Sequence, residues 1–221
     1  IHEVLRISDR ITVLRDGQYV GTVESSAASE QRVINMMVGR ELDRSAFVAP
    51  EHLGDTLLEV RGLSGAGFRN VSFSVRAGEI VALSGLVGAG RSEVARAIFG
   101  ADRFEQGEVL LQGKSVRFAS PRAAIQAGLA MVQEDRKVLS LFMNMQILKN
   151  ISLAELPFMT QGVIDERRER SLADRLVGQL DIRLAALTDP VSSLSGGNQQ
   201  KTVLARWLAT EPKLLILDEP T

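Results

Sequence analysis

The chain has 221 residues, of which 45% are hydrophobic, enough to build one large domain or two smaller ones. Its 26 Lys and Arg residues against 27 Asp and Glu residues give a formal net charge of −1, so the composition offers no basic surface for nucleic acid. It has no cysteine and only two histidines, which excludes disulfide bonds and thiolate metal sites, and no apolar run approaches the ~18 residues of a membrane span.

Residues 1–40 predict the closing part of one domain. Asp16-Gly17 is a strong turn signal inside residues 10–23, whose apolar and β-branched runs predict a hairpin. Ser29 is a good N-cap for a helix over residues 30–38. We therefore expect a small hairpin-and-helix unit ahead of the next domain.

Residues 41–56 combine charged residues with Pro50 and Gly54 and show no periodicity, which indicates a linker. The chain begins at Ile1 within a helical pattern and stops at Thr221, directly after a strand and an acidic loop. From these two ends we expect the chain to be a fragment of a longer polypeptide.

A second unit is expected from Leu57 onward. Short apolar or alternating runs predict strands, including one hairpin, at 58–61, 71–75, 80–83, 107–118, 129–132 and 213–217. Helical periodicity and capping residues predict helices at 93–99, 120–128, 148–156 and 165–180. The charged run 166–170 is expected to be a solvated helix face.

Residues 85–92 carry the strongest local motif. The run Gly-Leu-Val-Gly-Ala-Gly-Arg-Ser has the spacing of the phosphate-binding loop G-x-x-x-x-G-K-[ST], with Arg91 in place of the lysine. A predicted strand at 80–83 precedes it and a predicted helix at 93–99 follows it. That order aims backbone N–H groups and a helix N-terminus at a polyphosphate. Taken alone, the loop could also be a tight strand-to-helix turn.

Two segments near the end of the chain complete the pattern. Asp218-Glu219 follow the strand at 213–217, where the first carboxylate can hold Mg²⁺ and the second can orient an attacking water. For these two residues alone, an ordinary strand-to-turn boundary is the alternative. Residues 194–201, Leu-Ser-Gly-Gly-Asn-Gln-Gln-Lys, open a helix with apolar residues at helical spacing. Together with the glycine loop, these segments favour a nucleotide site.

Residues 85–92, 194–201 and 214–221 together resemble the ATP-binding cassette (ABC) family, the last two being similar to its signature motif and its Walker B strand. With the run Glu134-Asp-Arg-Lys, they are similar to the second cassette of the tandem ATPases of bacterial monosaccharide importers, the ribose/galactose/xylose group. Residues 1–40 resemble the end of that family's first cassette.

The resemblance implies an α/β fold in which a P-loop NTPase core is joined by a helical subdomain and a small antiparallel β subdomain. It assigns residues 1–40 to the tail of the first cassette, 41–56 to the linker and 57–221 to a second cassette that is incomplete after Walker B. Within the second cassette, it places the helical subdomain near 138–190 and the small sheet near 57–73 and 107–118.

The resemblance also implies roles for individual residues. Nucleotide binding falls to the loop residues Gly85, Gly88, Ala89, Gly90, Arg91 and Ser92, and to Gln133 and Glu134, which are both candidates for the glutamine-loop position. Ser92 and Asp218 are expected on Mg²⁺, and Glu219 is expected to be the catalytic base. The signature residues, expected on the ATP of the opposite cassette, are Leu194, Ser195, Gly196, Gly197, Asn198 and Gln199. Phe68 and Phe73 are candidates for stacking on adenine, although alternation favours the core for Phe73.

The implied function is ATP binding and hydrolysis, with Mg²⁺, coupled to import of a monosaccharide. The expected partners are a transmembrane permease, indirectly a periplasmic sugar-binding protein, and the first cassette of the same chain or a second copy, at the cytoplasmic face of the bacterial inner membrane. Nucleic acid is not expected as a partner. Because the guanidinium of Arg91 is a planar fork and not a point charge, we expect this site to bind ATP but to hydrolyse it poorly, while it donates its signature motif to the first cassette's site.

Two other functions are compatible with the same motifs. The first is a tandem-cassette protein without a transporter, acting on ribosomes or DNA. The second is a purely regulatory nucleotide-binding module, which Arg91 favours and the intact Asp218 and Glu219 disfavour.

Overall fold

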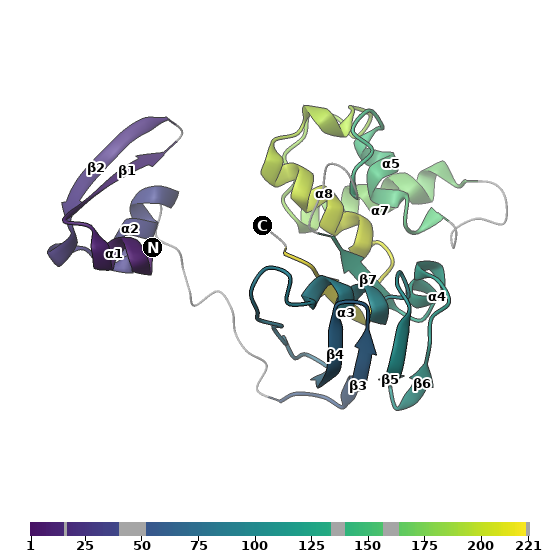
Figure 1. Cartoon of the computed structure of the whole chain (residues 1–221). Coiled ribbons are helices and arrows are strands. Elements are labelled where there is room, and N and C mark those ends of the chain that lie inside the picture. Colours follow the sequence, from purple (N-terminus) through teal and green to yellow (C-terminus); the bar gives the residue numbers. More distant parts are fainter. Residues whose placement is uncertain (16, 40–51, 134–139, 157–163, 220–221) are drawn as a thin grey trace. The chain divides into compact units, whose positions relative to one another are not determined.

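The computed structural model describes residues 1–15, 17–39, 52–133, 140–156 and 164–219 (Figure 1). The chain divides into two compact units, Ile1–Glu51 and His52–Thr221. Residues 41–51 of the expected linker and the candidate site residue Glu134 lie outside the described residues.

The first unit is a hairpin packed against helices. It contains α1 (His2–Ile7), β1 (Arg10–Arg15), β2 (Gln18–Glu24), the short 3₁₀ helix η1 (Ser25–Ala27) and α2 (Glu30–Val38). β1 and β2 pair antiparallel, and the buried side chains are those of Ile11, Val13, Val23 and Val33. Ser29 caps α2 by accepting a hydrogen bond from the backbone N–H of Arg32 at 3.2 Å. The predicted hairpin and helix are confirmed.

The second unit begins with a four-stranded antiparallel sheet. Its strands are β3 (Thr56–Gly65), β4 (Phe68–Arg76), β5 (Phe104–Leu111) and β6 (Lys114–Val116), in the order β4-β3-β5-β6. Leu58, Val60 and Val109 point from it into the core, at alternating positions along their strands. This is the small antiparallel subdomain expected from the resemblance.

A parallel strand pair and two helices pack against that sheet. They are α3 (Arg91–Ile98), α4 (Pro121–Gln126), β7 (Leu129–Val132) and β8 (Leu214–Leu217). β7 and β8 pair in parallel, with Val132 opposite Leu217, and their side chains join those of α3 in one hydrophobic cluster. Ser120 caps α4 as predicted.

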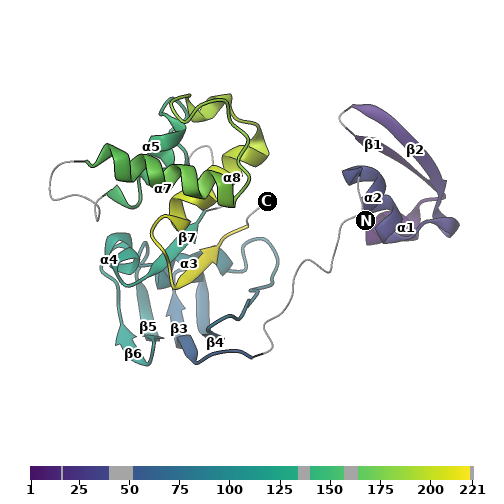
Figure 2. The ribbon, with the colours of Figure 1, turned by 180° about the vertical axis from the view of Figure 1, so that it is seen from behind.

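The remaining elements form a helical region. They are α5 (Ile147–Ser152), α7 (Glu166–Gln179), the short 3₁₀ helix η4 (Val191–Ser193) and α8 (Gly196–Leu208). They enclose a hydrophobic cluster of their own, and Trp207 of α8 packs against both this cluster and the one beneath the sheet. Figures 1 and 2 show α5, α7 and α8 gathered at one end of the second unit and the four-stranded sheet at the other.

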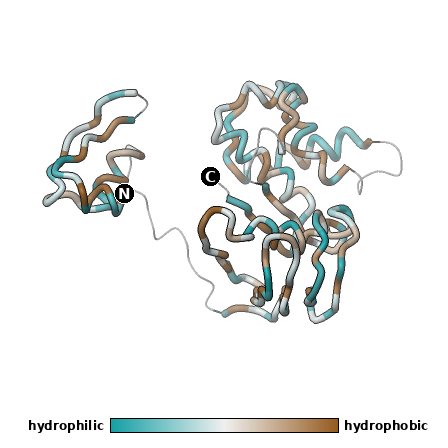
Figure 3. The backbone as a smooth tube through the Cα atoms, viewed as in Figure 1, coloured by the Kyte–Doolittle hydropathy of each residue, from teal (hydrophilic) through white to brown (hydrophobic). Residues whose placement is uncertain are grey.

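The strand predicted at 80–83 is wrong. Residues 79–86 form no strand, and Ile80 is 75% exposed. A parallel core strand is stabilised by hydrogen-bonded neighbours and by burial of both of its faces. Among the described residues, β7 and β8 pair only with each other. The segment at 80–83 therefore has no hydrogen-bonded neighbouring strand. Figure 3 shows its apolar residues along the extended stretch that leads to α3.

The prediction of a solvated face over residues 166–170 is wrong at one position. Glu169 has an exposed fraction of 0%, and its carboxylate accepts hydrogen bonds from Lys149 Nζ at 2.6 Å and from Ser152 Oγ at 2.5 Å. A buried carboxylate is tolerated because both of its oxygens are paired. α7 therefore turns one charged residue toward α5 and leaves the others in solvent.

Candidate functional site

The glycine loop at 85–92 is built as a turn that ends in a helix. The backbone N–H of Ala89 donates to the carbonyl of Leu86 at 3.0 Å, and Gly90 is the N-cap of α3 with φ 87°. No side chain caps this helix, so the N–H groups of its first turn face outward without a side-chain acceptor. Leu86 and Val87 are 86% and 97% exposed, so solutes reach the loop freely.

Glycine is required at two positions of the loop for different reasons. Gly88 has φ 80°, a left-handed conformation, but a Cβ built on it meets nothing within 4 Å. At Gly90, a Cβ would lie 2.5 Å from the carbonyl oxygen of Gly67, in the turn between β3 and β4. The loop thus rests directly on that turn, and only glycine permits so close an approach.

Two carboxylates reach the loop from the end of β8. The backbone N–H of Asp218 donates to the carbonyl of Val132 at 2.9 Å, which extends the parallel pairing of β7 and β8 by one residue. Glu219 then has φ 45°, so the backbone leaves the extended conformation there. The hydrogen bond at the end of the strand therefore fixes the position of Asp218. The left-handed backbone conformation of Glu219 sets the direction in which its own side chain leaves the strand.

The polar side chains of the loop meet these carboxylates. Ser92 Oγ donates to Oδ1 of Asp218 at 2.8 Å. Arg91 Nη2 lies 2.6 Å from Oε1 of Glu219, a charge-assisted hydrogen bond between side chains that are 30% and 45% exposed. The structure thus brings together the four residues to which the sequence assigned phosphate, metal and water chemistry.

The donor set fits Mg²⁺. A serine hydroxyl and a carboxylate oxygen are hard oxygen ligands, and Mg²⁺ prefers such ligands while keeping several waters or phosphate oxygens. The described residues contain no group of three or more His, Asp or Glu side chains that could enclose a metal ion. The pair therefore suits an ion completed by phosphate and water, and does not suit a site made by protein alone.

The structure places Gln133 near the site, but it places the two aromatic candidates in or against the hydrophobic core. Gln133 directly follows β7, so it lies at the same end of the parallel pair as Asp218, and it is half-buried. Phe68 is only 7% exposed and belongs to the core cluster, and Phe73 packs against the same cluster. Because Phe68 is buried, its interpretation as a stacking residue is wrong, and the packing of Phe73 agrees with the core position that alternation favoured.

The signature segment divides into an exposed and a buried half. Ser195 is the N-cap of α8, and both Ser195 and Gly197 are exposed. Asn198 fixes this turn, because its Nδ2 donates to Ser195 Oγ at 3.1 Å and its Oδ1 accepts from the backbone N–H of Arg183 at 3.0 Å. In contrast, Leu194 belongs to the helical cluster, and the buried Gln199 donates to the Leu194 carbonyl at 3.0 Å.

Arg206 is a buried cation on α8 that the sequence analysis did not single out. It is 6% exposed, and its guanidinium donates to the backbone carbonyls of Asn150 and Ser140 and to the side-chain oxygen of Asn150, the last at 2.7 Å. Burial lowers the pKa of Arg206 to about 10, which leaves it charged at neutral pH. Helical spacing marked this face as apolar, and no local pattern predicts the acceptors on another element.

Asn150 extends this network into the segment before α5. It is fully buried, and its Nδ2 donates to the carbonyls of Phe142, Met145 and Gln146 at 3.1 to 3.2 Å. The backbone N–H of Val191, shortly before the signature segment, also donates to Met145 at 3.0 Å. The segment that leads into α8 is therefore bonded to this loop directly, and the buried arginine of α8 is linked to it through Asn150.

Comparisons with known proteins identify the family of the chain. A family model described as ABC transporter matches residues 68–221. The chain belongs to the ABC transporter family. Within it, the chain is similar to the ribose import ATP-binding protein RbsA 3 of Rubrobacter xylanophilus, with 47% identity over 222 residues, 100% of this chain and 44% of that protein. RbsA 2 of Streptomyces avermitilis is 46% identical over 100% of this chain and 44% of its own length.

The chain thus spans less than half the length of these relatives. Among solved structures, an ATP-binding cassette described as a dimer in a post-hydrolysis state bound to ADP and Pi has a TM-score of 0.63 at 22% identity, over 75% of each chain. This likeness establishes the fold, the α/β architecture of ABC nucleotide-binding domains. No helix among the described residues has both the length and the apolar character needed to cross a membrane.

Proposed function

We propose that residues 85–92, together with Asp218 and Glu219, bind the triphosphate of ATP. The observation that carries the proposal is the convergence of Ser92 on Asp218 at 2.8 Å and of Arg91 on Glu219 at 2.6 Å. Membership of the ABC transporter family supports a nucleotide as the ligand.

Each part of the loop has a distinct role in this proposal. The uncapped N-terminus of α3 offers N–H groups and a partial positive charge to phosphate oxygens. Arg91 supplies a full positive charge with several donors in one plane. Gln133, directly after β7, and Glu134 remain candidates for a further contact.

Ser92 and Asp218 are the residues that would hold Mg²⁺, which when bound neutralises charge on the phosphate oxygens. Glu219 is placed one residue beyond Asp218 and would orient the attacking water and accept its proton. These roles divide the chemistry between two adjacent carboxylates of the same strand end.

The exposed half of the signature segment is proposed to face a second cassette. Ser195, Gly196 and Gly197 would contact the ATP held by that cassette, which is the first cassette of the same protein or a second copy. The exposure of Ser195 and Gly197 and the uncapped N-terminus of α8 support an external anion as the ligand. The side chains of Leu194 and Gln199 would support the turn from within, and Asn198 would set its shape.

In the cell, we propose that this cassette powers the import of a monosaccharide as part of a longer ATPase. The names of the curated relatives, which are ribose import ATP-binding proteins, support this substrate class. The partners would be a transmembrane permease and, through it, a periplasmic sugar-binding protein. The ATPase would then act as a peripheral protein at the cytoplasmic face of the bacterial inner membrane.

Hydrolysis at this site is proposed to be weak because Arg91 replaces the lysine of the motif, and its guanidinium is a broad planar fork where lysine is a compact point charge. The test is single-turnover hydrolysis at this site in the full-length protein. Arg91→Lys should raise the rate by tenfold or more, since optimal transition-state contacts are typically worth about that much or more. An unchanged rate would refute weak hydrolysis caused by Arg91.

The 221-residue chain by itself is expected to have little steady-state ATPase activity, because the proposed site needs a signature segment from another cassette. Turnover is measured with purified chain and compared with that of Glu219→Gln. Robust turnover that this substitution abolishes would contradict the expectation.

A further inference from the structure

We propose that Glu219 and a phosphate group compete for the guanidinium of Arg91, so that Arg91 is a positioning residue that holds the Glu219 carboxylate until a polyphosphate replaces it. The inference rests on the proposed function, because it takes the phosphates of a nucleotide as the competitor. It adds a link between binding and catalysis, since the carboxylate expected to act as base is released only when Arg91 turns to phosphate.

The ion pair is specific and accessible. Arg91 Nη2 and Glu219 Oε1 are 2.6 Å apart, at the short end of the range for charge-assisted hydrogen bonds. The backbone on the Glu219 side has φ 45°, which few residues other than glycine adopt. Both side chains are partly exposed, at 30% and 45%, so a solute can reach the guanidinium.

The position of Arg91 creates a demand for an anion. It is the first residue of α3, and the N-terminus of a helix carries a partial positive charge that disfavours a neighbouring cation. The carboxylate of Glu219 balances the charge of the guanidinium, while the N–H groups at this end of the helix have no side-chain cap. A phosphate group carries more charge and more acceptor oxygens, so it is the stronger partner for the same two features.

Both anions cannot stay in close contact with Arg91 without cost. A carboxylate and a phosphate at van der Waals distance repel each other, and the guanidinium offsets this repulsion only in part. Binding of a polyphosphate should therefore displace Glu219. Conversely, Glu219 should lower the affinity of the loop for nucleotides through Arg91.

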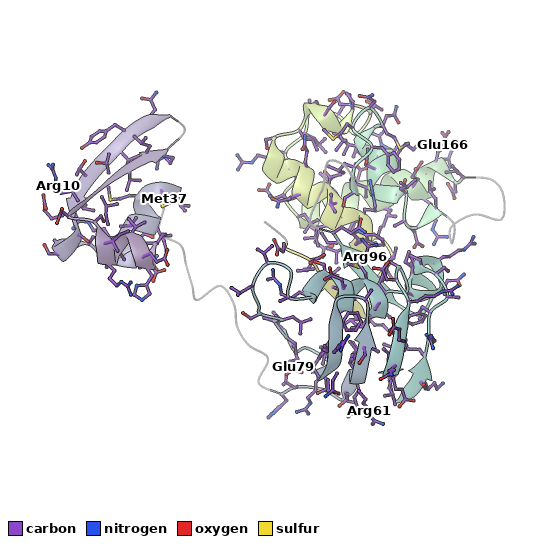
Figure 4. All side chains as sticks on the ribbon, viewed as in Figure 1. Arg10, Met37, Arg61, Glu79, Arg96 and Glu166 are labelled. Carbon is purple, nitrogen blue, oxygen red and sulfur yellow. The ribbon has the colours of Figure 1, made fainter. Side chains whose placement is uncertain are left out.

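The chain offers a matched control on the same helix. Arg96 is labelled in Figure 4. Its Nε lies 2.7 Å from Asp102 Oδ2, and these side chains are 45% and 41% exposed, much like the Arg91 pair. Asp102→Asn and Glu219→Gln thus each remove one carboxylate from an arginine of α3. Of these two ion pairs, only that of Arg91 and Glu219 involves the loop at 85–92.

The experiment is an equilibrium titration of the full chain with ADP and with a non-hydrolysable ATP analogue, in EDTA. Binding is the readout, so hydrolysis does not enter. Glu219→Gln should tighten binding about two- to fivefold, the range expected for a partly exposed ion pair. Asp102→Asn should change it less than about 1.5-fold. In an Arg91→Ala background, Glu219→Gln should give no gain.

The outcomes separate this inference from the proposed function. Equal gains from Glu219→Gln and Asp102→Asn, or no gain from the first, overturn the competition while nucleotide binding stands. The same gain with and without Arg91 also overturns it, because simple charge repulsion then explains the effect. If no variant binds nucleotide, the wild-type chain included, the proposed function itself fails.

Discussion

The hydroxyl of Ser92 lies 2.8 Å from Oδ1 of Asp218, although 126 positions separate the two residues in the chain. Ser92 is held in the first turn of α3, and Asp218 is held by the hydrogen bond of its N–H to Val132. Two oxygen ligands are thus fixed side by side by separate elements. Metal binding at the proposed site can be tested at these residues.

Removing either ligand should weaken nucleotide binding only when Mg²⁺ is present. Ser92→Ala and Asp218→Asn should each lower the Mg²⁺-dependent part of ATP-analogue affinity by about tenfold, within the range known for residues that support a metal site. The Mg²⁺-dependent part is the ratio of the affinity measured with Mg²⁺ to the affinity measured in EDTA. The exposed Ser74→Ala, on β4, serves as the control. An equal loss in EDTA would show that Mg²⁺ is not involved.

The two loop glycines should respond differently to alanine. Gly88→Ala should cost about 1 kcal/mol of unfolding free energy, because only the left-handed backbone is strained. Gly90→Ala should cost about 3 kcal/mol, because its Cβ would also displace the carbonyl of Gly67. Urea unfolding is followed by the fluorescence of Trp207, the only tryptophan of the chain. Equal costs would mean that the loop does not rest on the turn between β3 and β4.

At the signature segment, stability and function should move in opposite directions. A Cβ at Gly197 meets nothing within 4 Å, so Gly197→Ala should stabilise α8 by about 0.5–1 kcal/mol. The added methyl group should nevertheless reduce ATP-dependent association with a second cassette, since it covers N–H groups proposed to face phosphate. Gly178→Ala, on α7, is equally unobstructed and should stabilise without affecting association. Association is measured by sedimentation, and an undisturbed complex would remove Gly197 from the interface.

The buried arginine of α8 should be needed for stability as a guanidinium. Arg206→Lys keeps the charge but cannot supply three donors in one plane to Ser140 and Asn150, so it should cost about 1–3 kcal/mol. Arg170→Lys, at a 65% exposed position of α7, should cost less than about 0.5 kcal/mol. Both values come from urea unfolding, and a neutral Arg206→Lys would show that the network is not required.

Local sequence signals predicted the elements that depend on local chemistry. The turn at Asp16-Gly17, the cap at Ser29 and the cap at Ser120 specify hairpins and helix starts within a few residues, and the strands and helices around them are confirmed. The motif at 85–92 also correctly predicted that a helix follows its glycines, because the glycines and the start of the helix are contiguous in sequence.

What the sequence could not predict depends on partners far away in the chain. The apolar run 80–83 says nothing about whether a neighbouring strand is present, and it remains unpaired and exposed. The charge of Glu169 predicts solvent exposure until its partner Lys149 on α5 is known. Likewise, the ion pair of Arg91 and Glu219 joins residues 128 positions apart, and neither motif alone predicts it.

The central claim is that the loop at 85–92 is the polyphosphate site, and the most direct test compares two arginines of α3. Isothermal titration of the chain with ADP is repeated for Arg91→Ala and Arg96→Ala. The account predicts a loss of about tenfold or more at Arg91, as expected for a charge-assisted contact, and less than about twofold at Arg96. Equal affinities for wild type and Arg91→Ala, or equal losses at the two arginines, would contradict it.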